Sequence, residues 1–141
     1  LAEESELDID GDYYSYCDFY YERVANNNNT MTDCIVWHNG SSADENDSVD
    51  VTWNLEGKYD TVSGTIFLPK DDKNTDGNGY FKAYGDGALI YTSPKIVRDL
   101  LPQEISFNVS GVQKLKIEFY AEAGYGRFAI SNICAQKDFP D

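Results

Sequence analysis

The feature that most constrains the fold of this chain is the alternation of apolar and polar residues with a period of two. Val49, Val51, Trp53 and Leu55 share one face of an extended segment, and polar residues occupy the opposite face. Such alternation is typical of half-buried β-strands in antiparallel sheets. The pattern predicts about nine strands, separated by turn residues every 8 to 12 positions or so. They lie near residues 13–24, 34–38, 48–55, 58–68, 79–84, 88–92, 103–109, 113–121 and 126–135.

This pattern predicts an all-β fold, a jelly-roll β-sandwich of about nine antiparallel strands. The one helical candidate is residues 96–101, which precede Pro102, and a loop is an equal alternative. A chain of 141 residues has the length of one domain. We expect residues 1–12 to be an acidic linker or edge segment, residues 13–137 to be a single sandwich, and residues 138–141 to be a tail.

The charge of the chain limits its partners. It has 11 Lys and Arg against 25 Asp and Glu, a formal net charge of −14. Such a charge repels the phosphates of nucleic acid and of anionic membranes, so we expect neither as a partner. We expect neutral saccharides as the ligands. The chain also lacks the run of roughly 20 apolar residues that a membrane span needs, and because it does not begin with Met, we expect it to follow a signal peptide or to lie inside a longer polypeptide.

The three cysteines say little about the redox compartment of the protein. An odd number cannot form a closed disulfide framework, and no pair has the spacing of a zinc site. A bridge between Cys17 and Cys34 is one alternative. Cys134 lies in step with Phe128 and Ile130, so we expect it to be buried as a small apolar residue.

Catalytic residues are not expected. His38 is the only histidine, and no Ser or Cys lies in a nucleophile motif. The many carboxylates make any acid pair uninformative, and one domain of this size provides no second lobe for a deep cleft. We therefore predict that this chain is not an enzyme.

A candidate calcium loop begins at Asp72. Oxygen side chains at Asp72, Asn74 and Asp76, followed by Gly77, match the first half of a calcium-binding loop. The twelfth position is Ala83, where a bidentate Glu would be needed, so a polar hairpin loop is the alternative reading. Residues 8–12 have a similar but weaker pattern.

Aromatic residues beside polar ones are the candidates for ligand contact. Sugars have apolar C–H faces ringed by hydroxyls, so a binding surface combines aromatic rings with hydrogen-bonding groups. We predict a first surface at loops near the sandwich ends and a second on the Tyr-Lys-Tyr stripe of one strand. The first comprises Asn28, Trp37, His38, Asn39, Tyr125 and Arg127, and the second comprises Tyr80, Lys82 and Tyr84.

Each candidate also has a structural alternative. Trp37 is equally a residue of the core edge, His38 a polar strand end, and Arg127 a surface cation. The stripe is equally a cover for a sheet edge. Trp53, which is in phase with three apolar neighbours, is expected in the core.

Three blocks of sequence resemble the NPCBM family. They are the run from Leu55 to Ile66, which contains Leu-Glu-Gly-Lys-Tyr; the turn Gly85-Asp86-Gly87 with Leu89 to Ser93 after it; and the stretch from Ile105 to Ile117, which contains Val-Ser-Gly-Val. The resemblance implies a galactose-binding-domain-like jelly roll that binds polysaccharide or oligosaccharide without catalysis. It also implies secretion or display on a bacterial surface, attached to a glycan-degrading enzyme or surface protein. The alternative is a structural or adhesive sandwich that contacts another protein. We expect a monomer.

Overall fold

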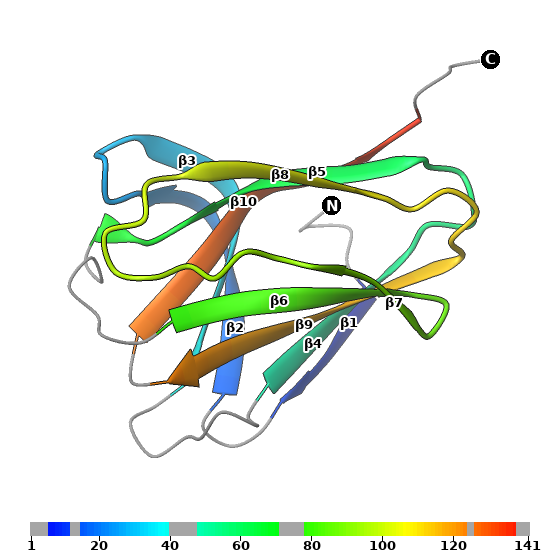
Figure 1. Ribbon diagram of the computed structural model, residues 1–141, viewed down its shortest axis with the longest axis horizontal. Coiled ribbons are helices and arrows are strands. Elements are labelled where there is room, and N and C mark those ends of the chain that lie inside the picture. Colours follow the sequence, from blue (N-terminus) through cyan, green and yellow to red (C-terminus); the bar gives the residue numbers. More distant parts are fainter. Residues whose placement is uncertain (1–5, 12–14, 40–47, 71–77, 124–125, 138–141) are drawn as a thin grey trace.

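The structure is a computed structural model that describes residues 6–11, 15–39, 48–70, 78–123 and 126–137. The described residues form ten strands in two five-stranded sheets and include no α-helix. Figure 1 shows the sheets as two layers facing each other. The strands are β1 (Glu6–Gly11), β2 (Ser15–Val24), β3 (Thr30–Asn39), β4 (Ser48–Asn54), β5 (Thr61–Phe67), β6 (Asn78–Gly85), β7 (Ala88–Thr92), β8 (Gln103–Asn108), β9 (Lys114–Ala123) and β10 (Gly126–Gln136).

The strand order confirms the all-β sandwich. One sheet has the order β1-β4-β9-β6-β7 and the other β2-β3-β10-β5-β8, and every pair is antiparallel. The strand that the alternation did not predict is β1, which pairs with β4 at the edge of the first sheet. Residues 6–11 are thus an edge strand, which is one of the two alternatives for the acidic N-terminal segment.

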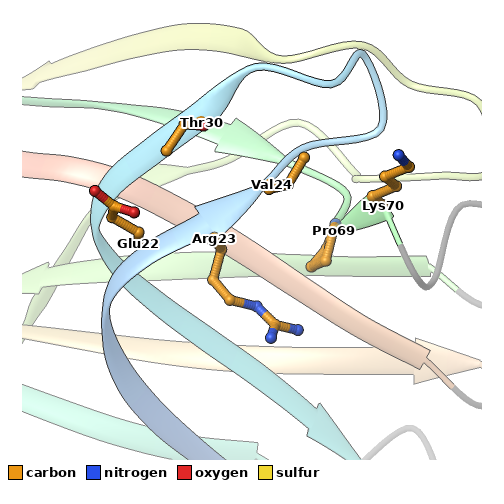
Figure 2. A pocket seen from close by; sticks show the side chains of 6 residues that line it. All are labelled: Glu22, Arg23, Val24, Thr30, Pro69 and Lys70. Atoms are coloured by element: carbon orange, nitrogen blue, oxygen red, sulfur yellow. The ribbon is translucent and has the colours of Figure 1, made fainter.

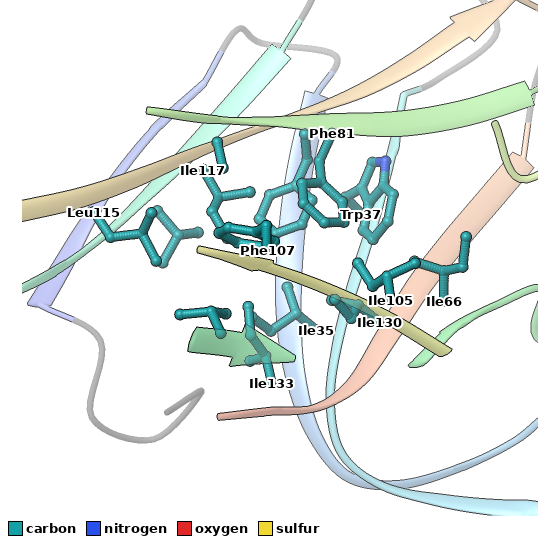
Figure 3. Packing of buried hydrophobic residues seen from close by; sticks show 14 of the residues in the cluster. Ile35, Trp37, Ile66, Phe81, Ile105, Phe107, Leu115, Ile117, Ile130 and Ile133 are labelled. Atoms are coloured by element: carbon teal, nitrogen blue, oxygen red, sulfur yellow. The ribbon is translucent and has the colours of Figure 1, made fainter. Parts of the chain in front are cut away.

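The core lies between the sheets because each strand turns its apolar face inward. In β6, Phe81 and Ala83 are buried while Tyr80, Lys82 and Tyr84 are half-buried on the outer face. Figure 3 shows the side chains of the two sheets meeting in the interior. Trp53 is buried, as expected. The inner cluster includes Ile35, Val51, Leu55, Val62, Ile66, Phe107, Leu115, Ile117, Phe119, Phe128, Ile130 and Ile133.

The hairpin between β6 and β7 has the turn that its sequence predicts. Asp86 and Gly87 have φ angles of 50° and 89°. Two successive positive φ angles are typical of the type I′ turn, whose twist matches that of paired strands. The Asp86 carboxylate also accepts hydrogen bonds from the backbone N–H groups of Gln113 and Lys114, which fixes the turn against the start of β9.

Cys134 does not follow the predicted alternation. The pairing of β10 with β5 shifts register between Ser131 and Cys134, and Asn132 has a φ of 49°. This bulge inserts one residue, so that Ile133 points into the core and Cys134 is only half-buried, with its Sγ 3.5 Å from the Ser63 Oγ. The expectation of a buried Cys134 is therefore wrong.

The structure also decides between two pairs of alternatives. Cys34 is a free, buried thiol, so the bridge between Cys17 and Cys34 is absent. The segment 96–101 is a loop rather than a helix. Ile96 is buried there and exchanges two backbone hydrogen bonds with Gly79, at 2.6 and 3.1 Å, which tie the loop to β6.

Candidate functional site

The first predicted contact surface is divided by the topology. Asn28 lies in the turn that precedes β3, with a φ of 69°, whereas Asn39 is the last residue of that ten-residue strand. At about 3.3 Å per residue, the two are about 30 Å apart along the strand. Asn28 and Asn39 therefore lie too far apart to contact the same small ligand.

Trp37 belongs to the core. Its side chain is 1% exposed, and its ring lies 4.5 Å from that of Phe119 and 6.4 Å from that of Phe128, centroid to centroid. Its Nε1–H donates a hydrogen bond of 3.0 Å to the backbone oxygen of Tyr120, which joins β3 of one sheet to β9 of the other. The prediction of Trp37 as a ligand contact is wrong, because the indole satisfies its polar group across the core.

The other residues of the first surface are only partly described. Strand pairing places His38 opposite Arg127 and Asn39 opposite Gly126, and Arg127 is half-buried. Tyr125 lies outside the described residues, as do Asp72, Asn74 and Asp76 of the candidate calcium loop. Within the described residues, no three His, Cys, Asp or Glu side chains gather in a way that could hold a metal ion.

The three residues of the second predicted surface lie on one face of β6, and strand pairing places two more side chains beside them. Tyr80, Lys82 and Tyr84 of β6 lie beside Glu118 and Tyr120 of β9, because Tyr80 pairs with Tyr120 and Lys82 with Glu118. We call these five residues the tyrosine face. All five are half-buried on the outer side of the sheet. The alternation in β9 places Glu118 and Tyr120 on an outer face, but only the pairing of β6 with β9 brings them to the stripe.

Aromatic and cationic groups alternate on the tyrosine face. The Tyr80 and Tyr120 rings stack with centroids 5.0 Å apart and an angle of 14°. The Lys82 ammonium lies 5.6 Å from the Tyr120 ring centroid, and the Lys95 ammonium lies 5.8 Å from that of Tyr80. The Lys116 ammonium lies 4.9 Å from the Tyr84 ring centroid. Cations at these distances are attracted by the faces of the rings.

Glu118 is the acceptor at the centre of this surface. Its Oε2 accepts hydrogen bonds from the hydroxyl groups of Tyr120 and Tyr84, the latter at 3.4 Å, and its Oε1 lies 3.2 Å from the Lys116 ammonium. Burial disfavours its charged form, but these hydrogen bonds and the Lys116 charge outweigh that effect and hold the pKa of Glu118 below its usual value.

The groups around Glu118 keep their protons at neutral pH. The hydrogen bond to Glu118 raises the pKa of Lys116. Burial, together with the nearby carboxylate, raises the pKa of both Tyr84 and Tyr120. Lysine and tyrosine already titrate near 10, so the surface offers ammonium and neutral phenol groups throughout the physiological range.

A hollow of about 370 Å³ adjoins the Tyr84 ring. Its other lining residues are Thr52, Asp86, Gly87, Lys114 and Lys116. It thus combines an aromatic ring, a hydroxyl group, a carboxylate and two ammonium groups, which are the groups that bind a sugar ring and its hydroxyls.

Two other hollows contain no aromatic ring. One, of about 370 Å³, lies between β2, the start of β3 and the Pro69–Lys70 segment; Figure 2 shows its lining, which consists of Glu22, Arg23, Val24, Thr30, Pro69 and Lys70. The other, of about 570 Å³, is lined by residues of β5, β8 and β10, mainly small and polar ones. The hollow at Tyr84 is therefore the best match to a saccharide among the three.

None of the described residues belongs to a helix of the length and apolar character that a membrane span requires.

Comparisons with known proteins agree with this architecture. The model of the NPCBM/NEW2 domain family matches residues 27–129, which is well over half of the chain. No curated protein matches the sequence.

Solved structures with the same fold are distant in sequence. The CBM51 module of GH95 from Clostridium perfringens, in complex with methyl-galactose, has a TM-score of 0.70 at 14% identity, covering 96% of this chain and 97% of that one. CBM51-2 with the INT domains of ZmpB from the same organism, in complex with GlcNAc, has a TM-score of 0.72 at 13% identity, covering 97% of this chain. The tandem CBM51 modules of the family 98 glycoside hydrolase of Streptococcus pneumoniae SP3-BS71 have a TM-score of 0.70 at 11% identity, covering 98% of this chain.

This chain spans only part of two of those structures. It covers 31% of the ZmpB structure and 46% of the tandem-module structure. At identities this low, the likeness shows the fold of the module.

Proposed function

The chain belongs to the NPCBM/NEW2 domain family, and on this premise we propose that it is a carbohydrate-binding module without catalytic activity of its own. The observation that carries the proposal is the family match over residues 27–129, on a fold shared with CBM51 modules. Two of those modules are described in complex with methyl-galactose and GlcNAc. The tyrosine face supplies a surface of the kind that saccharide binding needs.

We further propose that the module works within a longer, extracellular polypeptide, as a monomeric unit attached to a glycan-degrading enzyme or a surface protein. The similar modules come from a GH95 protein, from ZmpB and from a family 98 glycoside hydrolase. Attachment to a bound module raises the effective concentration of a partner domain at its substrate, so that modest affinity suffices.

The tyrosine face and its adjoining hollow are the proposed contact surface. Tyr84 presents its ring at the hollow, while Thr52, Lys114 and Lys116 supply hydrogen-bonding groups around it. This arrangement supports one sugar residue at the Tyr84 ring and others along the outer side of β6 and β9.

Affinity gel electrophoresis with a panel of plant, host and microbial polysaccharides tests this proposal. A bound polysaccharide slows migration, and Tyr84→Ala is expected to weaken the retention about fivefold, since an aromatic contact contributes about 1 kcal/mol. The control is Tyr21→Ala, because Tyr21 is 73% exposed on β2 of the other sheet. Retention by no polysaccharide would contradict carbohydrate binding. Equal retention of both variants would place the contact elsewhere, for example near Asn39 and Arg127.

A protein-binding role depends on exposed apolar side chains. Among the large aliphatic side chains of the described residues, Leu101 is the most exposed, at 63%. A hydrogen bond of 2.7 Å from the Asn26 amide to the Leu100 oxygen ties that loop to the β2–β3 turn. The tyrosine face instead combines rings with ammonium and carboxylate groups. This composition is the reason that we place saccharides before proteins as ligands.

We also propose a structural calcium ion on the loop of Asp72, Asn74 and Asp76, on the strength of its oxygen spacing. Thermal melts of the same protein with calcium chloride and with a chelator provide the test. A ligand that binds only the folded state must raise the melting temperature, so identical melts would contradict the proposal.

A further inference from the structure

Two lysine ammonium groups lie over the stacked rings of the tyrosine face, on a strongly negative chain. The Lys82 and Lys95 ammonium groups lie over the Tyr120 and Tyr80 rings, and these two rings are stacked on each other. Two cations are thus held over one pair of rings, whereas the whole chain has a formal net charge of −14. We therefore ask which negatively charged groups lie close to the Lys82 ammonium.

The carboxylate nearest to Lys82 in the strand pairing is already engaged. Glu118 lies directly opposite Lys82 in the β6–β9 register. Its two oxygens bind Lys116 and the hydroxyls of Tyr84 and Tyr120 instead. In the part of the chain that the structure describes, no carboxylate lies within 4.0 Å of the Lys82 ammonium, whose recorded contact is the Tyr120 ring.

A lysine ammonium without a carboxylate partner can bind an anionic ligand group. The Tyr120 ring holds the Lys82 ammonium in place, so less side-chain entropy is lost when the group binds a ligand. The face of that ring is turned to the cation, which makes it less suited to stack on a neutral sugar. A carboxylate or sulfate on a saccharide provides the missing charge, and charge-assisted hydrogen bonds to an ammonium are the stronger kind.

We propose that the tyrosine face recognises acidic glycans, with Lys82 binding a carboxylate or sulfate group of the saccharide. The proposal rests on the proposed carbohydrate-binding function and narrows its ligand class. It departs from the expectation of neutral saccharides as the ligands. At physiological ionic strength the Debye length is about 8 Å, so distant acidic residues are screened while contacts at the surface are not.

Glycan-array binding with matched pairs tests this inference. Each acidic oligosaccharide, whether uronic, sialylated or sulfated, is printed beside its neutral parent, and the best pair is then titrated by calorimetry. We expect the acidic member to bind at least about tenfold more tightly, and the comparison of carboxylated with sulfated members identifies the anion. Neutral parents that bind as well as their acidic members would overturn the acid preference and leave carbohydrate binding intact. Binding of neither member in any pair would overturn both.

Substitutions of Lys82 test whether this residue is responsible for the preference for acidic saccharides. Lys82→Met keeps the apolar stem and removes the charge, so it is expected to weaken binding of the acidic member about tenfold and to leave the neutral parent unchanged. Lys82→Arg keeps the charge and is expected to retain binding. Lys70→Met is the matched control, because Lys70 is an exposed lysine at the hollow lined by Glu22 and Arg23, away from the tyrosine face. An equal loss in Lys82→Met and Lys70→Met, or an equal loss for acidic and neutral members, would overturn the proposal.

Discussion

Replacement of Trp37 by phenylalanine is expected to destabilise the protein by about 2–4 kcal/mol and to leave saccharide binding unchanged. The indole Nε1–H bond to the Tyr120 oxygen, 3.0 Å long, links the two sheets inside the core. Removal of the donor leaves a buried carbonyl without this partner, at a cost of about 1–2 kcal/mol. The smaller ring also leaves a cavity beside Phe119 and Phe128, and loss of those contacts costs a similar amount, about 1–2 kcal/mol.

Urea denaturation measures this effect. With a denaturant dependence of about 2 kcal/mol per molar, the unfolding midpoint is expected to fall by about 1–2 M. Trp53 remains buried in the variant and reports unfolding by its fluorescence. Tyr21→Phe, at an exposed position, serves as the control. An unchanged midpoint together with lost retention in a polysaccharide gel would refute the reasoning, because it would mean that the indole contacts ligand rather than the core.

Three further predictions concern packing, the buried thiol and Glu118. In Gly79→Ala, the new Cβ would overlap the Phe128 ring, so we expect a loss of about 1–3 kcal/mol in the free energy of unfolding, and an unchanged urea midpoint would contradict it. Burial raises the pKa of Cys34 to about 11, so at pH 8 iodoacetamide should label Cys34 only after unfolding. Peptide mass spectrometry measures the labelling. Labelling of the folded protein at the unfolded rate, or recovery of a disulfide peptide that joins Cys17 to Cys34, would contradict this prediction. Because the folded state lowers the pKa of Glu118, the stability that its charge contributes is present above the usual glutamate pKa of about 4.3 and is lost as the pH falls through the lower folded value. The difference in urea midpoint between the wild type and Glu118→Gln should therefore shrink over that range, and a pH-independent difference would disagree.

Much of the sandwich was predictable from local patterns. A strand with one buried face must alternate, so Val49 to Leu55 predicted β4 and the burial of Trp53. The Asp86-Gly87 pair predicted a hairpin, because it adopts positive φ angles at little cost. The Tyr80, Lys82 and Tyr84 stripe was correctly placed on one face of a strand for the same reason.

The candidate site was predictable only in part. Its β6 residues were found by their spacing, but Tyr120 and Glu118 lie more than 30 positions further along the chain, and their own segment carried no sign of which strand would be its neighbour. The placement of Asn28 and Asn39 at opposite ends of β3 was also missed, since the two polar loops looked alike as sequence.

The amino-acid sequence by itself determined the strands, the turns and the face that each strand buries, because these depend on a period of two and on local backbone preference. Tertiary structure alone decided that Trp37 closes the core through Tyr120, that a bulge at Asn132 turns Cys134 outward, and that Glu118 binds Lys116 rather than Lys82. Those outcomes depend on which strands pair and in what register. Pairing brings together residues that are far apart in the chain, and no local period encodes it.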